Sequence, residues 1–155
     1  MKSNNFILNL SKELKVQLKV FCKKIEIAGS IRRKDPTPFD IDIVLIPKSE
    51  IHKQKIREFL TKKGKFIQGG EKRETFRIKG IKVELYFTTS ESWGATLLAY
   101  SSEKGSAIGL RLIAKRKGLH LNQYGLFKGK KMLVGKTEKE IYKTLQRPYK
   151  RPENR

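Results

Sequence analysis

The spacing of hydrophobic residues predicts two kinds of local structure, and the balance between them changes near residue 90. Before that point, short segments alternate between apolar and polar positions, as strands do, and longer segments have helical spacing. The predicted elements are a helix capped by Ser11 that carries Leu14, Leu18 and Phe21, strands at 24–28 and 39–46, a helix from Ser49 to about residue 62, and strands at 65–68, 75–78 and 82–88. Lys79-Gly80 is a turn signal that makes the last two strands a hairpin.

After residue 90 the pattern becomes mainly helical. The predicted elements are helices at 93–100 and 107–117, a small hairpin within the turn-rich segment 118–134, and a closing helix at 137–145. Thr137 and Glu140 have the spacing of a capping box, and Pro148 and Pro152 predict an extended tail. The whole pattern predicts an α+β fold, with a mixed sheet and flanking helices over residues 1–90 and a small, mainly helical subdomain over residues 91–155.

The chain is strongly basic, with 36 Lys and Arg against 15 Asp and Glu and a formal charge of +21. An excess of positive charge this large favours a polyanionic partner. Nucleic acid is the leading candidate, because phosphate contacts release condensed counterions. A membrane is disfavoured, since the basic residues are spread over many elements and no run approaches the roughly 20 apolar residues of a spanning helix. The single cysteine, Cys22, and the lack of a signal-peptide pattern favour an intracellular, cytoplasmic protein.

Two carboxylates occupy the start of the strand predicted at 39–46. Side chains two positions apart on a strand share a face, so Asp40 and Asp42 point the same way while Ile41, Ile43 and Leu45 point into the core. Carboxylates at the end of a buried strand repel each other and lose solvation, and a divalent cation relieves both costs. Because the ligands are oxygen atoms, Mg²⁺ or Mn²⁺ is expected.

A third carboxylate lies on the strand predicted at 82–88. Glu84 alternates with Val83 and Leu85, which places it on the non-core face. If this strand pairs beside the one that carries Asp40 and Asp42, three carboxylates converge and can hold two cations about 3.5–4 Å apart for phosphoryl displacement. The alternative is that Glu84 merely forms a surface salt bridge with Lys82 or Arg77.

The segment Ala28-Gly29-Ser30-Ile31-Arg32-Arg33 has the features of a phosphate-binding turn. It follows a predicted strand and precedes the two aspartates by about ten residues. The Gly29-Ser30 turn lets backbone N–H groups and a hydroxyl approach phosphate oxygens, and Arg33 can make a bidentate phosphate contact.

These motifs together closely resemble the palm of family X DNA polymerases. The resemblance continues beyond the palm, through 93–102, the thumb-like segments 110–114 and 118–127, and the closing segments 137–142 and 148–152, so it covers nearly the whole chain from about residue 12. It implies a palm over residues 1–90 and a thumb over residues 91–155, as in a compact form of the family known from a large DNA virus. We expect no lyase domain.

The resemblance also implies roles for individual residues. Asp40 and Asp42 would bind both metal ions, and Glu84 would bind the catalytic ion and help accept the proton of the primer 3′-hydroxyl. Gly29, Ser30 and Arg33 would hold the triphosphate, with Ala99 and Tyr100 under the sugar and base. The residues expected to meet DNA are Arg111, Lys115, Arg116, Asn122 and Tyr124. The last turn of the 107–117 helix offers a second explanation for Lys115 and Arg116, because cations there also complement the helix dipole.

Several positions depart from the family pattern. Glu84 stands where an Asp is usual, Ala99-Tyr100 replaces a Tyr-Phe pair, and Ser101-Ser102 replaces Thr-Gly. Ala107 occupies the place of a nucleotide-binding Asn in many members. We therefore expect low fidelity and leave sugar selectivity open.

The expected activity is gap-filling DNA synthesis in repair, from dNTP and a DNA primer-template, by a monomer that uses two Mg²⁺ or Mn²⁺ ions. One alternative is a template-independent or RNA-directed nucleotidyltransferase, which the altered nucleotide pocket motivates. The other is a catalytically inactive nucleic-acid-binding module, which would explain the charge but not the three acids.

Overall fold

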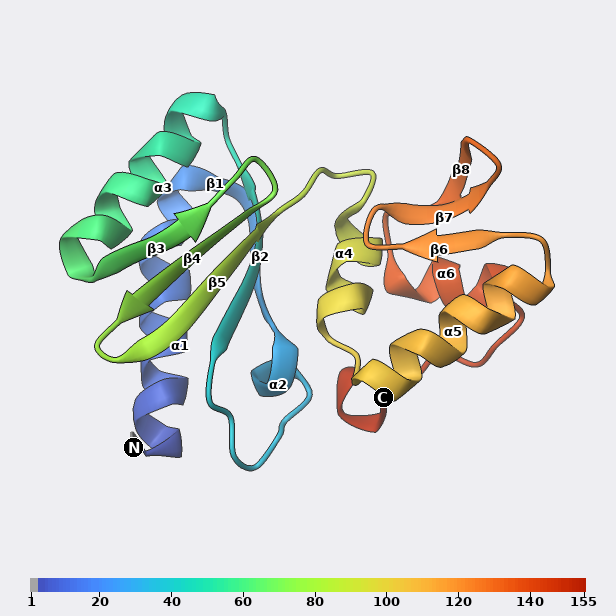
Figure 1. The fold of residues 1–155 in the computed structure, drawn as a ribbon, viewed down its shortest axis with the longest axis horizontal. Coiled ribbons are helices and arrows are strands. Elements are labelled where there is room, and N and C mark those ends of the chain that lie inside the picture. Colours follow the sequence, from blue (N-terminus) through green and yellow to red (C-terminus); the bar gives the residue numbers. More distant parts are fainter. Residues whose placement is uncertain (1–2) are drawn as a thin grey trace. The chain divides into compact units, whose positions relative to one another are not determined.

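A computed structural model describes residues 3–155, which divide into two compact units, residues 3–87 and Thr88–Arg155 (Figure 1). Each unit has its own hydrophobic core. The structure confirms the α+β fold, since the first unit contains a mixed sheet with helices and the second contains helices with a small sheet. Within residues 3–155, no helix is both long and apolar enough to cross a bilayer.

The first unit is built on a five-stranded sheet with the order β1-β2-β5-β4-β3. Strands β2 and β5 pair in parallel, whereas the other described neighbours are antiparallel. Its elements are α1 (Asn4–Leu18), the 3₁₀ turn η1 (Lys19–Phe21), β1 (Cys22–Ala28), α2 (Gly29–Arg32), β2 (Ile41–Pro47), α3 (Glu50–Lys63), β3 (Lys65–Gly69), β4 (Arg73–Ile78) and β5 (Ile81–Phe87).

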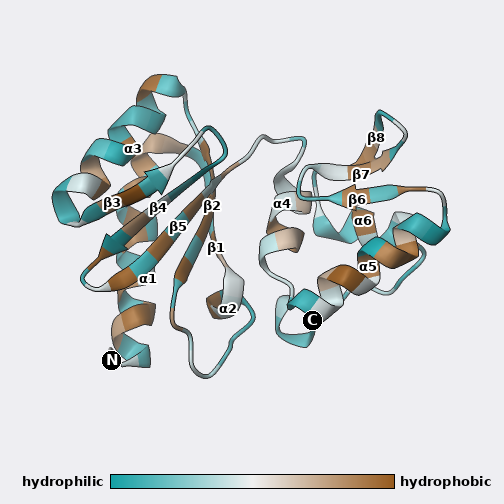
Figure 2. Ribbon diagram, in the orientation of Figure 1, coloured by the Kyte–Doolittle hydropathy of each residue, from teal (hydrophilic) through white to brown (hydrophobic). Residues whose placement is uncertain are grey.

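One face of this sheet forms the core with α1 and α3. Its central side chains are fully buried and come from β2 and the two helices: Leu14, Leu18, Ile41, Ile43, Leu45, Ile56 and Leu60. Figure 2 shows hydrophobic colouring along β2 and β5, whereas α3 is largely hydrophilic. Polar residues that alternate with the core residues on β2 and β5 are therefore directed to the opposite face.

The first helix begins earlier than the sequence pattern predicted. Ser3 caps α1, its side chain accepting a hydrogen bond from the backbone N–H of Phe6 at 3.2 Å. Ser11 is buried inside the helix and donates to the carbonyl oxygen of Leu8 at 2.7 Å, so its prediction as the cap is wrong. Ile7 and Leu10 extend the buried face by two turns, which stabilises the additional helix.

The hairpin predicted at Lys79-Gly80 is confirmed, and it fixes how β4 and β5 align. Both turn residues have positive φ, 51° and 82°, which matches the right-handed twist of the strands. Ile78 therefore lies opposite Ile81. Farther from the turn, Thr75 lies opposite Glu84 and Arg73 lies opposite Tyr86.

The second unit packs helices around a three-stranded sheet with the order β6-β7-β8. Its elements are α4 (Trp93–Tyr100), α5 (Lys104–Arg116), β6 (His120–Asn122), β7 (Gly125–Lys128), β8 (Lys131–Val134), α6 (Glu138–Thr144) and the 3₁₀ turn η2 (Pro152–Asn154). The capping box of Thr137 and Glu140 is confirmed. The sequence predicted a single small hairpin at 118–134, but this segment forms three strands. Strand β6 has only three residues, too few to show an alternation of apolar and polar positions.

The end of the chain is folded rather than extended. Residues 152–154 form η2, and the Arg155 side chain is completely buried. Its guanidinium pairs with Glu138 at 2.6 Å and lies 5.8 Å from the ring centre of Tyr142. A tertiary ion pair thus overrides the extended preference that Pro148 and Pro152 indicate, and the predicted extended tail is wrong at its end.

Candidate active site

The parallel pairing of β2 and β5 brings two of the three predicted acids side by side. Asp42 on β2 lies directly opposite Glu84 on β5. Their neighbours Ile41, Ile43 and Leu85 are fully buried in the core, so both carboxylates lie on the opposite face of the sheet. Asp40 lies one residue before β2 begins and is half-buried. The three acids therefore sit near the start of β2 and the middle of β5.

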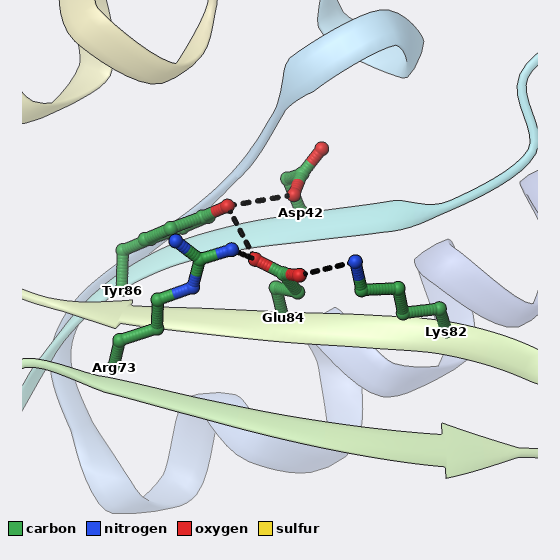
Figure 3. A network of polar contacts seen from close by, with 5 residues as sticks. All are labelled: Asp42, Arg73, Lys82, Glu84 and Tyr86. Carbon is green, nitrogen blue, oxygen red and sulfur yellow. Dashed lines mark hydrogen bonds and ion pairs between the residues drawn. The ribbon is translucent and has the colours of Figure 1, made fainter. Parts of the chain in front are cut away.

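A tyrosine hydroxyl links the two paired carboxylates. The hydroxyl of Tyr86 lies 2.7 Å from Oε2 of Glu84 and 3.1 Å from Oδ1 of Asp42 (Figure 3). Burial and the charges of Asp42 and Glu84 raise the pKa of Tyr86 far above its ordinary value, so the hydroxyl keeps its proton. It is therefore a hydrogen-bond donor to these carboxylates at neutral pH.

Glu84 is buried but neutralised by cations. Its Oε1 accepts a hydrogen bond from Nζ of Lys82 at 2.8 Å, and its Oε2 pairs with the guanidinium of Arg73 (Figure 3). Burial alone would raise the pKa of Glu84, but the hydrogen bonds from Lys82 and Tyr86 and the nearby positive charges hold this pKa below its ordinary value. Glu84 is thus ionised at neutral pH.

The sequence offered a surface salt bridge with Lys82 or Arg77 as the alternative explanation for Glu84, and the structure contains one of these two pairs. Lys82 is a partner, but Arg77 instead donates to the carbonyl oxygen of Gly80 at 3.2 Å. Glu84 itself is only 4% exposed, whereas the side chains of its partners Lys82 and Arg73 are 42% and 51% exposed. A buried carboxylate with two cationic partners is costly to build for stability alone, which favours a functional reason for its position.

The pKa of Asp42 is shifted in the opposite direction to that of Glu84. Burial raises its pKa to about 6; the negative charges of Glu84 and Asp40 add to this rise, and the Tyr86 hydrogen bond and the charge of Arg73 reduce it. The effect of Asp40 on this pKa means that the third acid is within electrostatic range. The charge of Arg73 and the Tyr86 hydrogen bond thus offset only part of the effect of burial and of the neighbouring acids on the pKa of Asp42.

The predicted phosphate-binding turn packs directly against Asp42. Gly29 begins the four-residue helix α2 with a φ of 63°, and an added Cβ there would lie 2.1 Å from Oδ2 of Asp42. Ser30 and Arg33 are half-buried, and the backbone N–H of Arg33 donates to the carbonyl oxygen of Gly29 at 3.1 Å. Only glycine fits this position, both for its φ and for its contact with Asp42.

The carboxylates have the donor chemistry of a site for a hard divalent cation. Within residues 3–155, no three Asp, Glu, His or Cys side chains are already gathered closely enough to hold a metal ion. Asp40, Asp42 and Glu84 nevertheless offer oxygen atoms alone, which suit Mg²⁺ or Mn²⁺.

Several of the predicted nucleotide and DNA contacts lie together in the second unit. Ala99, Arg111 and Asn122 line one shallow pocket with Ala107. Oδ1 of Asn122 accepts hydrogen bonds from the backbone N–H groups of the next turn, including that of Tyr124 at 2.8 Å. The others are spread over the unit: Tyr100 is half-buried at the end of α4, Tyr124 is exposed, and Lys115 and Arg116 are exposed in the last turn of α5.

Comparison with known proteins supports one family. The sequence profile of the DNA polymerase beta thumb matches residues 96–155. The repair DNA polymerase X of African swine fever virus is 29% identical over 147 residues in two isolates, covering 89% of this chain and 84% of the viral protein. A third isolate gives 28% identity over the same length. Together these similarities support a family X DNA polymerase.

The fold of this chain is also that of a solved polymerase beta. Polymerase beta of Leishmania infantum, in a structure described as a ternary P/T complex, superimposes with a TM-score of 0.78. The two chains are 22% identical, and the match covers 95% of this chain and 72% of the other. The similarity extends across both units, each of which therefore has the family fold.

Two residues of the site, Tyr86 and Arg73, were not singled out from the sequence. Tyr86 stands two positions after Glu84, so strand alternation could have placed it beside the acids. Arg73 could have been found from the hairpin, because the Lys79-Gly80 turn pairs Arg73 with Tyr86. Both signals require the strand pairing to be followed residue by residue.

Proposed function

We propose that this chain is a template-directed DNA polymerase that fills short gaps in DNA repair, adding nucleotides from dNTP to a primer 3′-hydroxyl. The named homologues and the shared fold support a repair DNA polymerase of family X. Because DNA and nucleoside triphosphates are intracellular compounds, we propose an intracellular site of action. We also propose that the chain acts as a monomer.

The observation that carries this proposal is the pairing of Asp42 with Glu84 beside the turn at Gly29. Two carboxylates on adjacent parallel strands and a phosphate-binding turn in contact with one of them form the arrangement that nucleotidyl transfer requires. A binding module would need the basic surface but would gain nothing from a buried acid cluster. An enzyme is therefore favoured over an inactive module.

We propose that Asp40, Asp42 and Glu84 hold two Mg²⁺ or Mn²⁺ ions. Such ions supply charge neutralisation for the triphosphate and for the attacking and leaving oxygens. Two features support this proposal. Burial and the charges of Glu84 and Asp40 raise the pKa of Asp42, and a bound cation would relieve both effects. The Lys82 side chain that pairs with Glu84 is 42% exposed.

The chain's own groups account for the rest of the reaction. The primer 3′-oxygen attacks the α-phosphorus of the dNTP, the bond to the bridging oxygen breaks, and pyrophosphate leaves. Glu84, which is ionised at neutral pH, is the proposed acceptor of the 3′-hydroxyl proton. Gly29, Ser30 and Arg33 are the proposed holders of the triphosphate, through backbone N–H groups, a hydroxyl and a guanidinium.

The second unit is the proposed thumb, with nucleotide and DNA contacts. Ala99 and Tyr100 would lie beneath the sugar and base, and the residues proposed to meet DNA are Arg111, Lys115, Arg116, Asn122 and Tyr124. Small side chains at Ala99 and Ala107 line the shallow pocket and offer few contacts for checking a base pair. We therefore propose that fidelity is low.

The test is single-nucleotide incorporation into a one-nucleotide gapped duplex, with each of four dNTPs in Mg²⁺, Mn²⁺ or EDTA. We expect metal-dependent insertion of the complementary nucleotide, with measurable misinsertion. Asp42→Ala should lose incorporation by on the order of 10³-fold or more while binding gapped DNA as well as the parent does. Glu58→Gln is the matched control, because Glu58 is an exposed acid on α3 whose loss changes the net charge equally.

The same assay separates the alternatives. Extension of single-stranded DNA without a template, or a preference for an RNA template, would establish the other kind of nucleotidyltransferase. Tight DNA binding with no incorporation in any metal would leave the inactive module. Retained incorporation in Asp42→Ala would refute the assignment of the acids.

A further inference from the structure

Packing alone does not explain why residue 86 carries a hydroxyl group. Tyr86 is 6% exposed, and a Phe would fill the same space on β5 without burying a hydroxyl. The hydroxyl instead lies between two carboxylates that come from neighbouring strands, 2.7 Å from Glu84 and 3.1 Å from Asp42 (Figure 3). A buried polar group with two partners of the same charge indicates an orienting role.

The Tyr86 hydroxyl contacts only one oxygen of each acid. In Asp42, Oδ1 faces Tyr86 and Oδ2 faces Gly29 of the proposed phosphate-binding turn. In Glu84, Oε2 is held by Tyr86 and Arg73, and Oε1 bonds the flexible ammonium of Lys82. The hydroxyl thus fixes the rotation of both carboxyl groups.

Arg73 fixes the tyrosine in turn. Its guanidinium carbon lies 5.1 Å from the ring centre of Tyr86, and the same guanidinium pairs with Oε2 of Glu84. The ring is therefore held between its strand neighbours and a cation, and the position of the hydroxyl is defined by three elements, β2, β4 and β5.

We propose that Tyr86 is a positioning residue of the catalytic acids, which sets the rotation of Asp42 and Glu84 so that the oxygens it does not contact are directed toward the divalent cation. The inference rests on the proposed function and adds a residue to it. Outer partners of this kind orient metal ligands, and their loss typically costs about 10–100-fold in metal affinity or activity.

The test is Tyr86→Phe, with binding of Mn²⁺ measured by electron paramagnetic resonance in the absence of DNA and dNTP. We expect apparent Mn²⁺ affinity to fall about tenfold and kcat for gap filling to fall by at least about tenfold, with Kd for gapped DNA unchanged. Thermal unfolding in EDTA checks that the variant is folded. Tyr142→Phe is the matched control, since it removes a buried tyrosine hydroxyl from the second unit.

Unchanged or tighter Mn²⁺ binding in Tyr86→Phe, relative to the parent, would overturn the proposal, because the hydroxyl would then be a structural group or a competitor for the carboxylates. An equal loss of Mn²⁺ affinity in Tyr142→Phe would also overturn it, since the effect would not depend on the contact with the acids. A parent protein that binds Mn²⁺ but incorporates no nucleotide would refute the proposed function, and the Mn²⁺ measurement would still decide the role of Tyr86.

Discussion

At the scale of single residues, the site depends on Gly29 and Asp42, whose surroundings restrict the backbone conformation of one and the ionisation of the other. Gly29 lies against Asp42 with a backbone conformation that other residues rarely adopt. Asp42 is a carboxylate that burial and neighbouring acids make difficult to ionise.

Replacing Gly29 should damage catalysis beyond its effect on folding. In Gly29→Ala, the Cβ would lie 2.1 Å from Oδ2 of Asp42, so the carboxylate must shift, and we expect kcat to fall on the order of 100-fold. Gly118→Ala is the control, because Gly118 has a similar φ of 74° but no atom within 4 Å of an added Cβ. Both variants should lose about 1 kcal/mol of unfolding free energy for the strained backbone. Equal gap-filling rates in the two variants would contradict the role given to the Gly29 contact.

The stability of the metal-free protein should depend on the ionisation of Asp42. Its pKa is about 6 in the folded chain and 3.8 ordinarily, so the folded state binds more protons between these values. Its contribution to stability is therefore complete below pH 3.8 and is lost as pH rises through about 6. At pH 7.5 in EDTA, Asp42→Asn should be more stable than the parent by about 1–3 kcal/mol, and the difference should disappear near pH 4. Urea unfolding at both pH values measures this, and a less stable variant at pH 7.5 would contradict it.

At the scale of elements, the second unit requires close approach of two helices. Gly94 of α4 lies against Thr137, the residue that caps α6, and an added Cβ would be 2.3 Å from the Thr137 carbonyl carbon. Backbone atoms cannot be displaced as a flexible side chain can. The two helices therefore touch at a point where only glycine fits.

Gly94→Ala should separate these helices and destabilise the second unit by on the order of 2–3 kcal/mol. The control is Gly109→Ala on α5, where an added Cβ meets no atom within 4 Å. That control should gain about 0.5–1 kcal/mol, because Ala favours a helix over Gly. Thermal unfolding of both variants gives the comparison, and a stabilised Gly94→Ala would contradict the packing described.

At the scale of the whole molecule, charge is the dominant property. The formal charge of +21 is shared by both units, since 15 of the 36 Lys and Arg and 5 of the 15 Asp and Glu lie in residues 88–155. The acid cluster is thus a local negative site in a strongly positive chain. Long-range attraction should bring DNA to the protein, while the acids decide the chemistry.

Binding of duplex DNA should therefore weaken steeply with salt. If about six phosphates are neutralised, affinity should fall about 10³-fold between roughly 50 and 200 mM KCl. Removing Lys115 and Arg116 together, as Gln, should reduce the slope of log affinity against log salt by about two. The control pair, Lys55→Gln with Lys62→Gln on α3, changes the net charge equally. A slope altered by the control pair and not by the α5 pair would contradict the proposed DNA contacts.

Much of this protein was determined by the sequence alone. Alternation along 39–46 and 82–88 predicted the strands, the face of Asp42 and Glu84, and the fold class, because strand and helix periods are local properties of the chain. The helix at 93–100 and the capping box at Thr137 were predicted for the same reason.

The tertiary structure decided the rest. The tertiary packing of strands and turns decided three features: the β2–β5 register that sets Asp42 against Glu84, the contact of Gly29 with Asp42, and the pairing of Glu84 with Arg73 rather than Arg77. The burial of Arg155 against Glu138 and the extension of α1 to Asn4 were likewise fixed by packing. Local patterns specify which face of an element a side chain occupies. Its partners on that face depend on which strands and helices pair, and this pairing is determined by packing of the whole core.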